Sequence, residues 1–312
     1  MAELHPLVAI VGPTAVGKTE FSLELAKRLE GEIVSCDSRL FYRGMDIGTA
    51  KPTLAERQRV PHHLIDIVDP WETFSLAQFQ CAAQAAIAAI HARCRLPLLV
   101  GGTGQYIRAV VEGWDVPRVA PNMALRGVLE AWAQEIGFQG IHQRLAALDP
   151  QAAANIDARN LRRTIRALEV IFSTGKPFSS QRRRSPASFR LLTVGLNRPR
   201  PELYARVDAR ISKMLADGLV EEVAGLLKKG CDPDLPALSA IGYREIVAHL
   251  QGRITLEEAV EQIRRATRLF VRRQANWFKL SDPSICWFEM GIGTVARVES
   301  LLRQWLASPA SD

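Results

Sequence analysis

The sequence has few cysteines, and their spacing excludes two classes of site. The five cysteines are odd in number and include no C-x-x-C pair; they are Cys36, Cys81, Cys94, Cys231 and Cys286. A disulfide framework needs paired cysteines, and a structural zinc site needs closely spaced ligands. We therefore expect reduced, mostly buried thiols.

Long hydrophobic runs are also missing. No stretch approaches the roughly 18 consecutive apolar residues that a membrane helix needs. The first residues lead into a short apolar run without the basic region or small-residue cleavage site of a secretion signal. We expect a cytoplasmic protein that does not contact a membrane.

Low-complexity tracts are absent, and the composition is that of a globular chain. Of the 312 residues, 47% are hydrophobic and 23% are charged, which excludes disordered and collagen-like chains. The net charge of +7 is uneven: residues 1–120 hold 12 Lys and Arg against 13 Asp and Glu, which leaves 28 against 20 for residues 121–312. This asymmetry indicates either a polyanionic partner for the second part or a solvated basic face.

Short apolar runs alternate with helical patterns in the first hundred residues, which is typical of a parallel α/β sheet. Strands are predicted at 7–11, 32–35, 98–100 and 190–196, and helices at 20–29 and 76–93. Further on the pattern is mainly helical. Helices are predicted at 125–135, 140–148, 160–172, 201–229 and 256–280.

The clearest motif is GPTAVGKT, which fits the phosphate-binding pattern G-x-x-x-x-G-K-[ST] between a predicted strand and a helix. Backbone N–H groups and the helix N-terminus would hold phosphate oxygens, Lys18 would add a positive charge, and Thr19 would bind Mg²⁺. The motif therefore predicts a di- or triphosphate site made by Gly12, Pro13, Thr14, Ala15, Val16, Gly17, Lys18 and Thr19. This loop alone does not fix the reaction.

The predicted fold is a P-loop NTPase-like α/β core, built on a parallel sheet, with an inserted all-helical domain. Residues 1–118 would form the first part of the core and residues 119–185 the helical insertion. Residues 186–312 would return one strand to the core and add the C-terminal helices.

An acidic residue follows the second predicted strand. Asp37 would lie at the carboxyl edge of the sheet beside the phosphate loop, where ligands collect in doubly wound folds. A carboxylate there can hold Mg²⁺ or accept a proton from an acceptor substrate. It can also simply cap the next element.

The third predicted strand lacks the acidic metal ligand that a hydrolytic P-loop enzyme usually has at this position. Leu98 to Val100 instead lead into Gly101-Gly102-Thr103-Gly104. The glycines allow close approach of another backbone or a flat ligand, and Thr103 places a hydroxyl where the acid would be. A plain turn is the alternative.

Taken together, these segments resemble the tRNA dimethylallyltransferase family, also called tRNA isopentenyltransferases, of the bacterial type. The resemblance covers about residues 7–280 and rests on GPTAVGKT, SCDSRLFYRGMDIGTAKP, PHHLIDIVDP and LLVGGTGQY, in the family's order. It continues in RRTIRALEV, SAIGYRE and RRATRLFVRRQANWFK, which resemble family segments that contact the anticodon arm.

The resemblance implies transfer of a dimethylallyl group from its diphosphate to the 6-amino group of the adenosine 3′ of the anticodon, in tRNAs that read codons beginning with U. It also implies Mg²⁺ as the cofactor, and a tRNA anticodon stem-loop and dimethylallyl diphosphate as partners. An arginine of the family that binds the diphosphate matches Arg210 best, with Arg206, one turn earlier on the same helix face, as second choice. The alternative is a solvated face paired with Asp208 or Glu202.

In that chemistry Asp37 would accept the proton of the amine, while Lys18, Thr19 and the arginine neutralise the leaving diphosphate. The residues expected to contact tRNA are Asp37, Ser38, Arg39, Leu40, Thr103, Arg126, Arg162, Arg163, Arg166, Gly242, Tyr243, Arg244, Arg268 and Arg272. We expect a monomer whose helical insertion swings over the anticodon stem.

Two other enzymes remain possible on these residues. An adenylate isopentenyltransferase would run the same chemistry on a mononucleotide, but it would not need the basic second part of the chain. A small-molecule kinase would use the same loop to bind ATP.

Overall fold

The computed structural model describes residues 4–117, 119–181 and 189–308. The chain divides into two compact units, Met1–Val111 with Ser188–Asp312 and Glu112–Ala187, and each is described by itself. The sequence placed the helical insertion at residues 119–185, which lies inside the second unit. Among the described residues, no helix is both long and apolar enough to cross a membrane.

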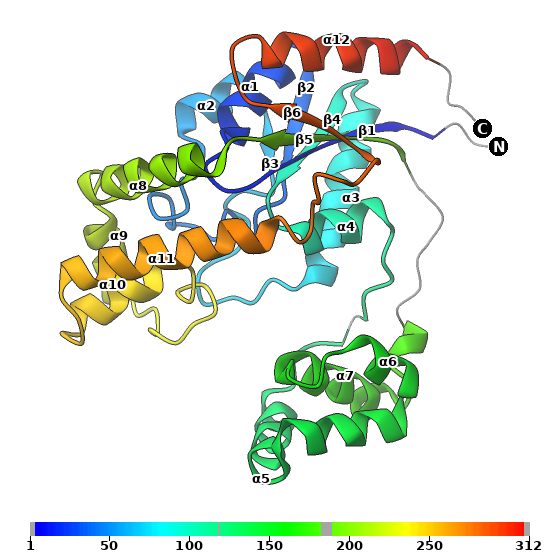
Figure 1. Ribbon diagram of the computed structural model, residues 1–312, viewed down its shortest axis with the longest axis vertical. Helices are drawn as coiled ribbons and strands as arrows, with labels where there is room; N and C mark the ends of the chain where they lie inside the picture. Colours follow the sequence, from blue (N-terminus) through cyan, green and yellow to red (C-terminus); the bar gives the residue numbers. More distant parts are fainter. Residues whose placement is uncertain (1–3, 118, 182–188, 309–312) are drawn as a thin grey trace. The chain divides into compact units, whose positions relative to one another are not determined.

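The first unit is built on one six-stranded parallel sheet in the order β3-β2-β4-β1-β5-β6 (Figure 1). The strands are β1 (Pro6–Val11), β2 (Gly31–Ser35), β3 (His62–His63), β4 (Leu96–Gly101), β5 (Arg190–Asn197) and β6 (Ile285–Glu289). The predicted strand at 190–196 does return to the sheet, where it pairs with β1. The α/β prediction for the core is therefore confirmed.

The first unit also contains helices, some of which cover the two faces of this sheet (Figure 1). They are α1 (Lys18–Arg28), α2 (Leu54–Arg59), α3 (Leu76–Ala92), α4 (Gly104–Val111), α8 (Arg200–Ala216), α9 (Leu219–Lys228), α10 (Tyr243–Leu250), α11 (Leu256–Gln274) and α12 (Thr294–Ala307). Side chains alternate along β1: Val8 and Ile10 pack with α1 and α8, whereas Leu7 and Val11 pack with α3 and α4. The two hydrophobic cores hold the carboxyl ends of the strands in place.

Two of the predicted C-terminal helices are shorter than the sequence indicated. The helix predicted over 201–229 is broken at Gly218, which takes a φ of 97° and separates α8 from α9. The helix predicted over 256–280 ends at Gln274, and the chain then turns toward β6. Strand β6 and helix α12 were not predicted.

The second unit is helical. Its elements are α5 (Met123–Leu148), α6 (Pro150–Asn155), α7 (Leu161–Thr174) and the short 3₁₀ helix η1 (Ser179–Gln181). Gly137, with a φ of 72° and a ψ of 169°, breaks α5 between the two helices that the sequence predicted there. The unit has its own core, which includes Leu129, Leu145 and Leu168.

The cysteines are free, but the expectation that most are buried is wrong. Cys36 and Cys231 are buried, whereas Cys81, Cys94 and Cys286 are exposed. The spacing pattern excluded pairing correctly, but it contains no information on which face of a helix or strand each thiol occupies.

Candidate functional site

The predicted chemical groups meet at the carboxyl edge of the sheet. The phosphate loop follows β1, Asp37 follows β2, and Thr103 follows β4. Since β4 lies between β2 and β1 and all three strands are parallel, the three segments are neighbours at the same edge. This is where ligands bind in open α/β sheets.

The phosphate loop has a backbone that only certain residues can form. A Cβ added to Gly12 would lie 2.6 Å from the Leu196 carbonyl oxygen of β5, so this position needs glycine. Ala15 and Gly17 have φ values of 66° and 106°, in the left-handed region. Gly17 ends the loop and caps α1, whose N-terminus points its free N–H groups toward the site.

Lys18 folds back on its own loop. Its Nζ donates to the carbonyl oxygens of Gly12 and Pro13, at 2.9 Å each. Burial of the ammonium lowers the pKa of Lys18 to about 8, an effect that Asp37 opposes and Arg210 reinforces. The same interactions show that Lys18, Asp37 and Arg210 are close enough to influence one another.

Two arginines of α8, Arg206 and Arg210, face this site and are not paired with Asp208 or Glu202. Arg206 Nε donates to the Ala15 carbonyl oxygen at 2.7 Å. Burial lowers the pKa of Arg210 from its ordinary value, with Asp37 raising it and Arg206 lowering it further. Asp208 binds Arg268 instead, and Glu202 binds Arg198. A phosphate loop with Lys18, Arg206 and Arg210 around it is suited to a dianionic or trianionic ligand.

Asp37 begins a partly exposed loop, which continues with Ser38, Arg39 and Leu40. One carboxylate oxygen of Asp37 accepts the Arg39 backbone N–H at 3.0 Å, a local turn that orients the side chain. Arg39 donates its guanidinium to the carbonyl oxygens of Pro236 and Ala237. Asp37 is thus held at the site without being a helix cap, the alternative that its position allowed.

Other parts of the chain approach the backbone of the glycine-rich segment after β4 closely. A Cβ at Gly101 would lie 2.3 Å from the Cys36 carbonyl oxygen, and one at Gly104 would lie 2.4 Å from Trp277. Gly104 begins helix α4, so the segment is not a plain turn. Thr103 is partly exposed between these contacts.

The donors available for Mg²⁺ are few. Thr19 is partly exposed at the N-terminus of α1, and Asp37 is the nearby carboxylate. Within the described residues, no group of three or more His, Cys, Asp or Glu side chains is arranged to hold a metal. A hydroxyl and a carboxylate fit Mg²⁺ as an ion that arrives with its phosphate ligand, because Mg²⁺ keeps several waters and few protein ligands in such sites.

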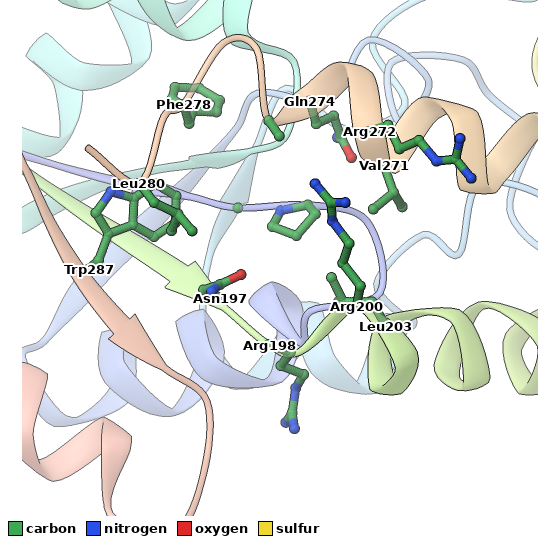
Figure 2. A pocket seen from close by; sticks show the side chains of 13 residues that line it. Asn197, Arg198, Arg200, Leu203, Val271, Arg272, Gln274, Phe278, Leu280 and Trp287 are labelled. Carbon is green, nitrogen blue, oxygen red and sulfur yellow. The ribbon is translucent and has the colours of Figure 1, made fainter. Parts of the chain in front are cut away.

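A pocket of about 100 Å³ opens beside Gly12 and Pro13. Figure 2 shows Arg200 reaching up from α8 toward Val271 and Gln274, while Arg198 points away. Phe278, Leu280 and Trp287 form an apolar side of the pocket. This space next to the phosphate loop therefore combines apolar walls with a positive charge.

The C-terminal arginines predicted to contact RNA lie along α11. Arg268 binds Asp208 at 2.7 Å and lies over the Tyr204 ring. Arg272 is exposed, and its Nε lies 3.3 Å from the Tyr204 hydroxyl. Of the nearby aromatics, Phe270 between these arginines is exposed, and Phe278 beyond the end of α11 is buried in the core.

The segment at Gly242, Tyr243 and Arg244, which was predicted to contact tRNA, is mostly buried. The Tyr243 side chain is fully buried, and its hydroxyl donates to Glu222 at 2.5 Å. Gly242 is also buried, and it precedes α10. Only Arg244 of this segment is exposed, where it pairs with Glu245. The Tyr243 ring therefore fills the core between α9 and α10, and the contact of this segment with tRNA stays a prediction.

In the second unit, the predicted basic face divides into two pairs. Arg162 and Arg163 are exposed on α7. Arg126 and Arg166 instead bind the fully buried carboxylate of Glu169, at 3.0 and 2.6 Å. Although burial alone would raise the pKa of Glu169, these hydrogen bonds hold it below its ordinary value.

Two polar side chains with contacts near the site, Glu222 and Gln274, were missed in the sequence. Glu222 accepts the backbone N–H groups of Asp46, Ile47 and Gly48, which fixes the loop that continues from Asp37. Gln274 is buried beside the phosphate loop. Its spacing of three residues after Val271 indicates a position on the buried face of α11, but not the partners of its side chain.

Comparison with known proteins gives consistent results. The sequence model of a family described as IPP transferase matches residues 40–281. A tRNA dimethylallyltransferase of Roseiflexus sp. (strain RS-1) is 54% identical over 301 residues, which cover 96% of this chain and 99% of the relative. A tRNA dimethylallyltransferase of Dehalococcoides mccartyi is 44% identical and covers 99% of this chain and 95% of its own.

Solved structures agree with these relatives. The tRNA isopentenylpyrophosphate transferase of Bacillus halodurans has a TM-score of 0.72 and 42% identity, with 97% of each chain covered. A eukaryotic dimethylallyltransferase crystallised while acting on tRNA has a TM-score of 0.81 and 25% identity, with 99% of this chain and 81% of that chain covered. Their fold is the P-loop NTPase-like fold predicted from the sequence.

Proposed function

We propose that this chain, which belongs to the IPP transferase family, transfers a dimethylallyl group from dimethylallyl diphosphate to tRNA and releases diphosphate. The acceptor is the 6-amino group of the adenosine 3′ of the anticodon, in tRNAs that read codons beginning with U. The observation that supports this best is the grouping of Lys18, Asp37 and Arg210 around the phosphate loop. This transfer needs positive groups to neutralise the leaving diphosphate and a carboxylate to accept the amine proton.

The diphosphate would bind at the phosphate loop. Lys18 would exchange the carbonyl oxygens of Gly12 and Pro13 for phosphate oxygens, and Arg210 would approach from α8. Mg²⁺, bound through Thr19 and the phosphates, would supply further neutralisation of the leaving group. These charges act where negative charge grows as the allylic C–O bond breaks.

Asp37 would act on the other substrate. The exocyclic amine of adenine is a weak nucleophile because its lone pair is delocalised into the ring. As the new C–N bond forms, the carboxylate of Asp37 would accept the amine proton, so that the product leaves uncharged. The local turn to Arg39 holds that carboxylate toward the site before the substrate arrives.

The tRNA would bind through its anticodon loop, whose unpaired bases can leave their stack. Exposed arginines support this: Arg272 on α11, Arg244 on α10, and Arg162 and Arg163 on α7. The remaining expected contacts, at Ser38, Leu40 and Thr103, line the site edge itself. We also propose that the enzyme is a cytoplasmic monomer in which a single chain supplies Lys18, Asp37 and Arg210.

Mass spectrometry of nucleosides tests the proposal against its rivals. The protein is incubated with Mg²⁺ and dimethylallyl diphosphate, with unmodified tRNA in one tube and AMP in another. We expect dimethylallyladenosine only in the tRNA digest. Prenylated AMP would indicate an adenylate isopentenyltransferase, and no product together with ATP consumption would indicate a kinase.

A further inference from the structure

Gln274 is a buried polar side chain at the site to which the chemistry above gives no role. It is the last residue of α11 and is 5% exposed. Figure 2 shows it at the end of that helix, directed into the pocket beside the phosphate loop. A buried amide needs hydrogen-bond partners for both its oxygen and its nitrogen.

Both partners belong to the site. Gln274 Oε1 accepts the Thr14 backbone N–H at 2.8 Å, and Gln274 Nε2 donates to the Gly102 carbonyl oxygen at 3.1 Å. One partner is a donor and the other an acceptor, so an amide satisfies both, whereas a carboxylate satisfies only Thr14. The side chain therefore connects the loop after β1 to the loop after β4.

The close fit at Gly102 supports a specific arrangement. A Cβ there would lie 2.3 Å from Gln274 Nε2, while the next atom, the Gly12 carbonyl oxygen, is 3.3 Å away. Gly102 also lacks the positive φ that would demand glycine for backbone reasons. The space that a side chain at Gly102 would need is thus taken mainly by the amide of Gln274.

We propose that Gln274 is a positioning residue for the diphosphate of the allylic substrate. By holding the Thr14 N–H away from the ligand and anchoring it to Gly102, it fixes the first half of the phosphate loop. The N–H groups of the second half and Lys18 are then already arranged for phosphate oxygens, which lowers the cost of ordering them on binding. The identity of the ligand rests on the proposed function.

The first test is Gln274→Ala, measured by calorimetry with Mg²⁺ pyrophosphate and with tRNA separately. We expect pyrophosphate affinity to fall about tenfold, the effect of losing a pair of buried hydrogen bonds, and tRNA affinity to change less than twofold. In turnover, KM for dimethylallyl diphosphate should rise more than kcat falls. Unchanged pyrophosphate affinity, or an equal loss of tRNA affinity, would overturn the proposal.

The second test is a double-mutant cycle with Gly102→Ala. Alone, Gly102→Ala should displace the Gln274 amide and weaken pyrophosphate binding by a similar factor. In the Gln274→Ala background the obstructing amide is gone, so Gly102→Ala should add less than a twofold further loss. Fully additive effects would show that the two positions act independently, against the proposal.

Conservative and control variants separate positioning from stability. Gln274→Glu retains an acceptor for Thr14 but sets a carboxylate oxygen against the Gly102 carbonyl, so it should not restore binding. Gln80→Ala removes another buried glutamine, which donates to Ala109 at 2.7 Å on α4. It should lower the unfolding temperature without changing pyrophosphate affinity; a loss of affinity in Gln80→Ala as large as in Gln274→Ala would contradict a positioning role.

Measuring pyrophosphate binding and tRNA prenylation separately distinguishes a failure of this inference from a failure of the proposed function. A wild-type protein that binds pyrophosphate but does not prenylate tRNA would contradict the function and leave the Gln274 measurement valid. A wild-type protein that prenylates tRNA, with Gln274→Ala binding pyrophosphate equally well, would contradict the inference alone.

Discussion

Arginines serve different purposes in the two units of this protein. At the sheet edge, Arg206 and Arg210 face the phosphate loop, while the nearby acids Glu202 and Asp208 bind other partners. In the helical unit, Arg126 and Arg166 are bound to the buried Glu169. A basic segment in sequence can thus mean a prepared anion site or an internal ion pair, and only the placement of acids distinguishes them.

The largest effect is expected at the sheet edge, from Asp37→Ala. Loss of the proton acceptor should lower the single-turnover rate by about 10² to 10⁴, while tRNA affinity changes little. Asp37→Asn, which keeps the shape and the turn to Arg39, should be nearly as slow. Asp69→Ala, which removes an acid that pairs with Arg43, is the matched control. Normal turnover in Asp37→Asn would remove Asp37 from the chemistry.

In the helical unit the expected effect is on stability. Glu169→Gln leaves Arg126 and Arg166 without their buried countercharge, and breaking such a pair costs about 3 kcal/mol or more. Chemical denaturation monitored in the helical unit measures this loss. Glu130→Gln, an exposed acid on α5, should cost less than about 0.5 kcal/mol. Equal values for the two variants would mean that the Glu169 pairs are not structural.

The pH dependence of diphosphate binding sharpens the description of the site. Lys18 has a pKa of about 8 in the free protein, below its ordinary value, so its positive charge is present below pH 8 and is lost as pH rises through that value. KM for dimethylallyl diphosphate should therefore rise severalfold between pH 7 and 9. Lys18→Arg, which stays charged, should flatten the profile. A profile that stays steep in Lys18→Arg would assign the titration to another group.

The smallest effect is expected on the side of α11 that we propose to contact RNA. Arg272→Ala should weaken tRNA binding severalfold and reduce the slope of log affinity against log salt by about 0.7 to 0.9, one phosphate contact. Arg303→Ala, an exposed arginine of α12, is the control. An unchanged salt slope would place Arg272 outside the RNA interface.

From the sequence, the segments that carry the chemical groups could be predicted better than the residues that hold those segments in place. GPTAVGKT, Asp37 and the glycine segment near Thr103 could be placed together because parallel strands end at one edge. Gln274 and Glu222 could not be assigned to the site from the sequence, because their roles depend on contacts between segments more than 170 residues apart. The burial of Tyr243 and the pairing of Arg126 were missed for the same reason: a motif gives residue type and order, but not which face is covered.

The most direct test of the account compares Arg210→Ala with Arg272→Ala, with dissociation constants for Mg²⁺ pyrophosphate and for tRNA measured on both. If the sheet edge holds the diphosphate and α11 holds the RNA, Arg210→Ala loses pyrophosphate affinity by at least tenfold with tRNA affinity retained. Arg272→Ala should show the reverse pattern. If both variants lost affinity for the same ligand, or if neither lost affinity for any ligand, the assignment of the diphosphate to the sheet edge and of the RNA to α11 would be contradicted.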